Sequence, residues 1–125
     1  MNLRHAGMLA LVVVGTALTP GYARADANGD MFEKVVQLIE QAAVIVDMNK
    51  SNCDAMGDKL NALIDPNTQL LANAKAQNER LTPDQKRALD ARFRPRIIAA
   101  MVKLRPGFAQ CSSNAKVTAA VQKIQ

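Results

Sequence analysis

The residues of this chain best suited to covalent chemistry are two cysteines, Cys53 and Cys111. In an oxidising compartment a lone pair of cysteines usually forms a disulfide, whereas a catalytic dithiol normally shows the closer Cys-x-x-Cys spacing. A bond between them would close a loop of about 59 residues, and it would stabilise the fold by roughly 4 kcal/mol in the chain-entropy description. We therefore predict a structural disulfide between Cys53 and Cys111.

Histidine occurs once, at His5, close to the start of the chain. Ser-His-Asp and Cys-His catalytic groups, histidine-ligated zinc and di-iron sites of the Glu-x-x-His kind all need a histidine in the folded domain. The few glycines are scattered and form no phosphate-binding loop. We expect no enzyme activity, no metal site and no cofactor, and an enzyme or metal carrier that works through carboxylates or lysine is the weakest class considered.

Four carboxylates recur every seven residues, which sets them in one line on a helix with about 10 Å between neighbours: Glu33, Glu40, Asp47 and Asp54. Carboxylates that share a metal ion or flank one bond in retaining glycoside hydrolysis must lie closer together. We interpret the line as a solvated or salt-bridging face. Asp54 and Asp58, one turn apart, could meet a cation weakly, but such pairs are common on helix surfaces.

Positive charge is concentrated in one later segment. Residues 26–79 carry nine acids and four bases, whereas residues 80–105 carry eight bases and only two acids. On a helix, one flank of the apolar stripe would hold Arg92, Arg96 and Lys103, and the other Arg87, Arg94 and Arg105. Either this helix lies beside the acidic first helix, or it presents a basic binding surface made of Arg87, Arg92, Arg94 and Arg96.

A basic surface of this kind would suit acidic or unfolded protein clients, or an anionic envelope surface. Nucleic acid is not expected as a partner, because the chain is predicted to be exported and lacks aromatic residues on which bases could stack.

Residues 1–25 are typical of a cleavable signal peptide. Arg4 and His5 precede an apolar core from Met8 to Leu18, and Ala23-Arg24-Ala25 has the small residues that signal peptidase requires. Cleavage after Ala25 is favoured, with a cut after Ala27 as the alternative. The apolar core is far shorter than the ~20 residues that span a bilayer, so we expect no membrane span after cleavage. The protein is predicted to be periplasmic or secreted, with residues 26–125 as a single helical domain.

The longest periodic pattern lies between Asp30 and Ile64 and predicts a helix with one apolar seam. The weak helix formers Asn49, Ser51 and Asn52 could divide it into two helices, but we favour one continuous helix that ends at Asp65-Pro66. The seam consists of Phe32, Val35, Ile39, Ala42, Val46, Asn49, Cys53, Met56, Leu60 and Leu63.

Three further helices are expected. The first covers residues 67–80; the second begins at the capping box of Thr82, Pro83 and Gln85, is bent at Pro95 and ends near Arg105-Pro106-Gly107. Its apolar stripe holds Leu89, Phe93, Ile97, Ala100 and Leu104, and the last helix uses Val117, Ala120, Val121 and Ile124. With short connections, these elements predict an all-α, antiparallel three- or four-helix bundle with one disulfide.

The segment from Leu81 to Arg87 resembles the Leu-Thr-x-x-Gln motif of the Spy/CpxP family of periplasmic envelope-stress proteins. The match covers residues 81–85, and the motif occurs once here, whereas the family usually shows it twice. The resemblance implies a chaperone-like or stress-sensing role, with Thr82 and Gln85 as helix caps. It also implies that clients bind a basic surface formed by Arg87, Arg92, Arg94 and Arg96.

These observations predict an exported, non-enzymatic helical protein that binds another macromolecule, with a periplasmic stress or chaperone-like role. The alternative is a structural or self-associating subunit whose long first helix docks on a copy of itself to form a homodimer.

Overall fold

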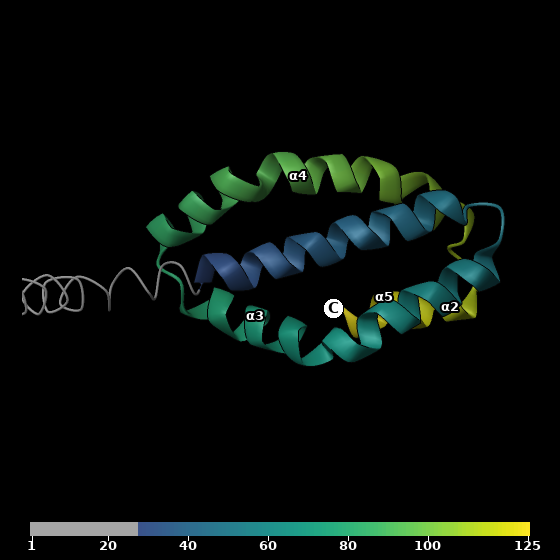
Figure 1. The fold of residues 1–125 in the computed structure, drawn as a ribbon, viewed down its shortest axis with the longest axis horizontal. Coiled ribbons are helices and arrows are strands. Elements are labelled where there is room, and N and C mark those ends of the chain that lie inside the picture. The colour runs from purple at the N-terminus through teal and green to yellow at the C-terminus, as the bar shows by residue number, and fades with distance from the viewer. Residues whose placement is uncertain (1–27) are drawn as a thin grey trace, which may run out of the picture. The chain divides into compact units, whose positions relative to one another are not determined.

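A computed structural model describes residues 28–125, of which residues 31–125 form one compact unit. The predicted signal peptide, residues 1–25, lies outside the described residues. A first helix covers residues 28–48, and no strand occurs between residues 28 and 125. The later elements are α2 (Cys53–Ile64), the short 3-10 helix η1 (Asp65–Asn67), α3 (Thr68–Arg80), α4 (Pro83–Gln110) and α5 (Ala115–Lys123) (Figure 1). The predicted all-α fold is confirmed.

Within residues 31–125 the first helix lies between two neighbours, of which α4 runs parallel to it and the α2–α3 segment runs antiparallel to it (Figure 1). On one side is α4, and on the other α2, η1 and α3 follow one another end to end, while α5 packs beside α2. Three long segments therefore form the bundle: the first helix, the α2–η1–α3 segment and α4. The short helix α5 packs on α2 as a fourth segment, in agreement with the predicted small helical bundle.

The prediction of one continuous helix to Ile64 is wrong, because the chain reverses direction at residues 49–52. The Asn49 Nδ2 atom donates to the Ile45 carbonyl at 2.7 Å, and the Asn52 Oδ1 atom accepts a hydrogen bond from the Ala55 amide at 3.1 Å as the N-cap of α2. Asparagine side chains offer the backbone such alternatives to helical bonds. The reversal lets α2 pack back along the first helix instead of extending away from it.

The predicted boundary before Pro66 is confirmed, but the physical reason given for it is not. Asp65 keeps a helical backbone (φ −54°, ψ −45°) although it precedes a proline. The chain tightens into η1 and enters α3 after Asn67, whose backbone angles (φ −111°, ψ 9°) lie outside the helical region. The Asn67 Nδ2 atom donates to the Leu63 carbonyl at 2.7 Å. A 3-10 turn therefore joins two helices here.

The predicted start of α4 is confirmed and its predicted end is wrong. The Thr82 amide donates to Gln85 Oε1 at 2.9 Å, and the Gln85 amide donates to Thr82 Oγ1 at 3.2 Å, which completes the capping box. Instead of stopping near Pro106, α4 continues to Gln110. Pro106 deprives the carbonyl of Val102 of its helical partner, and Val102 is 65% exposed, so water can replace that bond. With Pro95 also inside it, α4 is drawn as an arched helix (Figure 1).

The core is aliphatic and wider than the single predicted seam. Val36 and Ala43, which lie off that seam, are buried, because the first helix is covered from two sides. Phe93 is the one aromatic residue buried among the described residues. The central cluster consists of Ala43, Val46, Met56, Leu60, Ile64, Ala100, Leu104, Cys111, Val117 and Ala120.

The Cys53–Cys111 disulfide is confirmed, with the two Cα atoms 5.4 Å apart. It joins the first residue of α2 to the residue that caps α4. Close beside it, Gly107 has no room for a side chain: a Cβ atom there would lie 2.3 Å from Val46 Cγ1. At Gly57, a Cβ atom would lie 2.4 Å from Lys116 Cβ. Both glycines are therefore points of close helix contact.

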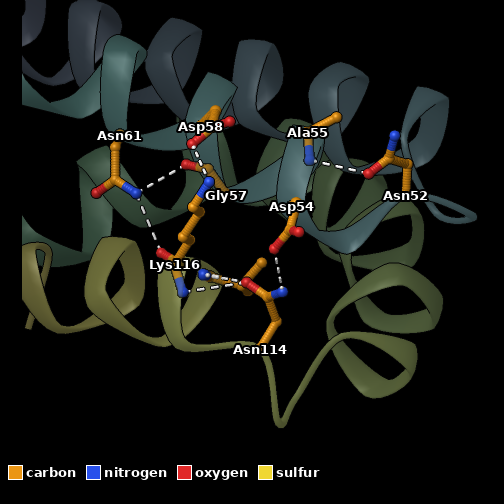
Figure 2. Close-up of polar contacts among 9 residues, drawn as sticks. Asn52, Asp54, Ala55, Gly57, Asp58, Asn61, Asn114 and Lys116 are labelled. Atoms are coloured by element: carbon orange, nitrogen blue, oxygen red, sulfur yellow. Dashed lines mark hydrogen bonds and ion pairs between the residues drawn. The ribbon is translucent and has the colours of Figure 1, made fainter.

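Hydrogen bonds and an ion pair connect α5 to α2 around Gly57 (Figure 2). The Asn61 Nδ2 atom donates to the Gly57 carbonyl at 2.7 Å and to the Lys116 carbonyl at 3.0 Å. The Asn114 side chain caps α5 and donates to Asp54 Oδ1 at 2.9 Å. Lys116 Nζ lies 3.0 Å from Asp58 Oδ1, and this hydrogen bond raises the pKa of Lys116.

We expect loss of the disulfide to lower the stability of the folded protein substantially. Replacing both Cys53 and Cys111 with serine should lower the free energy of unfolding by about 4 kcal/mol, because the unfolded chain regains the freedom of a long loop. Urea denaturation followed by circular dichroism measures this difference. Reduction of the wild-type protein should produce the same loss of stability. Unchanged stability in both experiments would show that the disulfide does not stabilise the fold.

The close contacts at the two glycines predict that alanine substitution lowers stability, whereas helix propensity alone predicts that it raises stability. A buried Gly→Ala change inside a helix would gain up to about 1 kcal/mol from propensity alone. We expect Gly57→Ala and Gly107→Ala instead to lower the free energy of unfolding by about 1–3 kcal/mol, because the helices must move apart. Ala91→Gly on the exposed side of α4 serves as the propensity control. Stabilisation by either alanine would contradict the close contact.

Candidate functional site

Arg96, one of the four predicted surface arginines, is used inside the bundle. Its Nη2 and Nε atoms donate to the two carboxylate oxygens of Glu40 at 2.5 and 3.2 Å, and its Nη1 atom donates to Glu33 at 2.5 Å. The Arg96 side chain is 35% exposed. The predicted pairing of the basic helix with the acidic first helix thus holds at Arg96, and the seven-residue spacing of Glu33 and Glu40 places both on its guanidinium group.

This cluster shifts the ionisation of its members. The hydrogen bonds from Arg96 lower the pKa of Glu40 from its ordinary value of 4.5. The bonds to Glu40 and Glu33 raise the pKa of Arg96 further above its ordinary value. Because the carboxylate is favoured in the folded state, the contribution of Glu40 to stability is full above its ordinary pKa and is lost as pH falls through the lowered one.

The other three predicted arginines are exposed and have only short-range partners. Arg87 pairs with Asp84 and Arg94 with Asp90, each within one turn of α4, and their side chains are 77% and 64% exposed. The Arg92 guanidinium lies 4.9 Å from the centre of the Phe93 ring. Exposed pairs of this kind are weak, so these charges can still reach a partner.

An apolar strip runs between the arginines on the outside of α4. Ile98, Met101 and Val102 are 55%, 41% and 65% exposed, and they follow Arg94 at helical spacings of four, seven and eight. We define the α4 outer strip as Arg87, Arg94, Ile98, Met101, Val102 and Arg105. No acidic residue follows Asp90 in the chain, so the far half of the strip has no carboxylate of its own helix beside it.

Sequence reasoning found the arginines of this strip but missed its apolar part. The sequence pattern assigns Ile97 to the inward stripe, and this assignment gives no sign by itself that the adjacent Ile98 points to solvent. A sequence signal did exist: Ile98 and Val102 lie more than 100° around the helix from Ala100 and Leu104, so one face could not hold them all. Arg96, by contrast, lies on the flank that faces the first helix.

The remaining carboxylates of the predicted line serve as structural partners. Asp47 lies 3.1 Å from Lys50, and Asp54 accepts a hydrogen bond from Asn114. Asp58, the cation partner considered for Asp54, pairs with Lys116. Between residues 28 and 125, no group of three or more acidic, cysteine or histidine side chains is placed to hold a metal ion.

The part of the chain that the structure describes contains no helix both long and apolar enough to cross a membrane. Comparison of the chain with protein-family models, with curated proteins and with solved structures finds no match.

The Arg96 cluster predicts a stability difference that depends on pH. Arg96→Gln should lower the thermal midpoint by a few degrees near neutral pH. This difference should shrink as pH falls below 4.5 and through the lowered pKa of Glu40 in the wild type, because protonation of Glu40 removes the ionic partner of Arg96. Thermal melts followed by circular dichroism at several pH values measure it. The matched control is Arg94→Gln on the same helix, for which we expect a smaller loss because that pair is more exposed. A loss for Arg96→Gln that does not vary with pH would contradict the ionic role.

Proposed function

We propose that this protein is an exported, non-enzymatic, chaperone-like protein that holds acidic, partly unfolded protein clients on the α4 outer strip. The observation that carries the proposal is the exposure of Ile98, Met101 and Val102 between Arg94 and Arg105 on one helix face. Apolar side chains that remain exposed in a group, with charges around them, mark interaction surfaces.

The dimensions of the strip suit an unfolded client. From Arg87 to Arg105 it extends about 27 Å along α4 at 1.5 Å per residue. Its apolar side chains lie together between Arg94 and Arg105, so an extended segment could place apolar residues on the middle of the strip and acidic residues beside them. Many weak contacts of this sort retain a client without selecting one sequence.

An anionic membrane surface is the less favoured partner for the same strip. Helices that lie in a membrane interface usually bury tryptophan, phenylalanine or leucine in the acyl region. The apolar members of the α4 outer strip are isoleucine, methionine and valine, on a helix whose opposite face is already committed to the bundle core. Protein clients therefore fit the strip better than lipid does.

Two further observations support the exported, chaperone-like reading. A disulfide that bridges α2 and α4 is typical of proteins in oxidising compartments, in agreement with the predicted signal peptide. The Leu-Thr-x-x-Gln segment that resembles the Spy/CpxP motif begins immediately before α4, the helix that carries the strip.

Self-association is the second candidate, and one observation favours it. Val44 and Met48 lie one turn apart on the first helix and are 49% and 76% exposed. Stable interfaces bury at least about 1,200 Å² in total, which two side chains from each copy cannot supply alone. A homodimer would therefore need to include additional surface from α4.

The proposal predicts that client holding depends on both chemical components of the strip. An acidic client protein diluted out of urea should aggregate less when the wild-type protein is present, as measured by light scattering. The triple variant Arg87→Gln, Arg94→Gln and Arg105→Gln should lose most of this effect, and so should Ile98→Ser with Val102→Ser. Added salt should weaken the wild-type effect, because exposed charges are screened.

The matched control is Arg96→Gln, which removes one positive charge from α4 but not from the strip. It should keep client holding at temperatures well below its midpoint. Full activity of the triple variant would exclude the strip as the client site. Binding of the wild type to phosphatidylglycerol vesicles without any holding activity would assign the strip to the membrane surface, and loss of holding in Met48→Gln together with a dimer-to-monomer change would favour self-association.

A further inference from the structure

The bundle contains a hollow that only apolar side chains line. It has a volume of about 230 Å³ and lies between the first helix, α2, α4 and α5, with Leu71 of α3 at its edge. Its lining includes Val35, Ile39, Ala42, Leu104, Phe108 and Val121. We call it the main hollow. Water finds few hydrogen-bond partners in such a space, and apolar cavities of similar volume bind apolar ligands.

A second hollow of about 220 Å³ adjoins the main hollow along the first helix. The two share Val35 and Ile39, and the second one continues between Phe32, Leu81 and the start of α4. The first-helix residues that line the pair extend from Phe32 to Ala42, which is about 15 Å at 1.5 Å per residue. The two hollows thus follow one another along the first helix, and this arrangement suits a linear chain better than a ring system.

Of these two hollows, only the second is lined by polar side chains. Asn78, Lys86 and Asp90 belong to its lining, whereas the main hollow has no polar side chain. The Asp90 carboxylate is paired with Arg94, so its charge is offset. The Asn78 amide and the Lys86 ammonium are hydrogen-bond donors, and they can meet an anionic group at this end. An apolar space with a few polar groups at one end is the usual form of a ligand site.

We propose that the two hollows bind one molecule of an anionic amphiphile with a single aliphatic chain. The chain occupies the main hollow, and the carboxylate or phosphate head group lies at Asn78 and Lys86. The charge of Lys86 selects an anionic head, and the length and uniform apolar lining of the space select an unbranched chain. This site lies inside the bundle, apart from the α4 outer strip, and does not depend on the function proposed for that strip.

Calorimetric titration of the disulfide-intact protein with dodecanoate, below the concentration at which it forms micelles, tests the site directly. We expect one molecule bound per chain and a higher thermal midpoint in its presence, because a ligand that binds only the native state stabilises it. Affinity should rise roughly fourfold for each methylene from hexanoate to dodecanoate. Dodecyl phosphate distinguishes a phosphate-bearing ligand from a fatty acid, and dodecyltrimethylammonium should bind at least tenfold more weakly than either.

Three variants test where the ligand lies. Ala42→Leu fills the main hollow and should reduce dodecanoate affinity at least tenfold while the thermal midpoint of the free protein stays equal or rises. If Ala42→Leu proves unstable, Val121→Phe fills the same space from α5. Lys86→Gln should weaken dodecanoate by severalfold and leave dodecyltrimethylammonium no weaker, whereas Lys103→Gln, the same change elsewhere on α4, should leave dodecanoate affinity unchanged.

Several results would overturn the proposal. Dodecanoate binding that survives in both filled variants would place the ligand outside the hollows. Equal affinity for dodecanoate and dodecyltrimethylammonium would remove the anionic selectivity assigned to Lys86. Absence of both calorimetric heat and thermal stabilisation at high micromolar dodecanoate would exclude the site altogether, whatever the outcome of the client-holding experiments.

Discussion

The Cys53–Cys111 disulfide holds together the end of the bundle at which the first helix, α2 and α4 meet, and the rest of the structure depends on it. The first helix reverses direction at residues 49–52, α2 begins at Cys53, and α4 ends just before Cys111. Gly107 brings α4 against Val46 beside this bond. Because three chain segments are fixed relative to one another here, α4 and the α2–α3 segment can pack on opposite sides of the first helix although the core contains few aromatic side chains.

The helices of the bundle pack closely near the disulfide and leave the main hollow farther from it. At Gly57 and Gly107 the missing side chains let helices approach closely. Farther along the first helix the facing residues are aliphatic, such as Leu38, Ile39 and Leu71, and Phe108 is the single aromatic residue of the main hollow. These side chains leave the main hollow between the helices unfilled. Poor filling would normally cost stability, and a bound aliphatic chain would remove that cost.

How far the sequence predicts this molecule depends on how local each determinant is. The capping box of Thr82 and Gln85 and the disulfide were predictable, because the first needs one turn of helix and the second only the compartment and the number of cysteines. The sequence permits a break at Asn52 but does not favour one, since heptad spacing survives across it. What decides it is the gain from packing α2 back on the first helix, which no local pattern records. The hollows and the exposure of Ile98 likewise arise only when the helices are placed together.

The basic residues of α4 show how one helix can serve both the fold and a partner. The helix repeat divides its arginines between two flanks. On the inner flank, Arg96 meets two carboxylates of the first helix that recur seven residues apart, so its charge is neutralised within the bundle. On the outer flank, Arg94 meets only Asp90 of its own helix, and Arg105 has no acidic residue after it in the chain. Positive charge therefore remains on the solvent side without like-charge repulsion inside the fold. Since Ile98 and Val102 share that side, the surplus charge and the exposed apolar area occupy one surface, and a partner that satisfies one also covers the other.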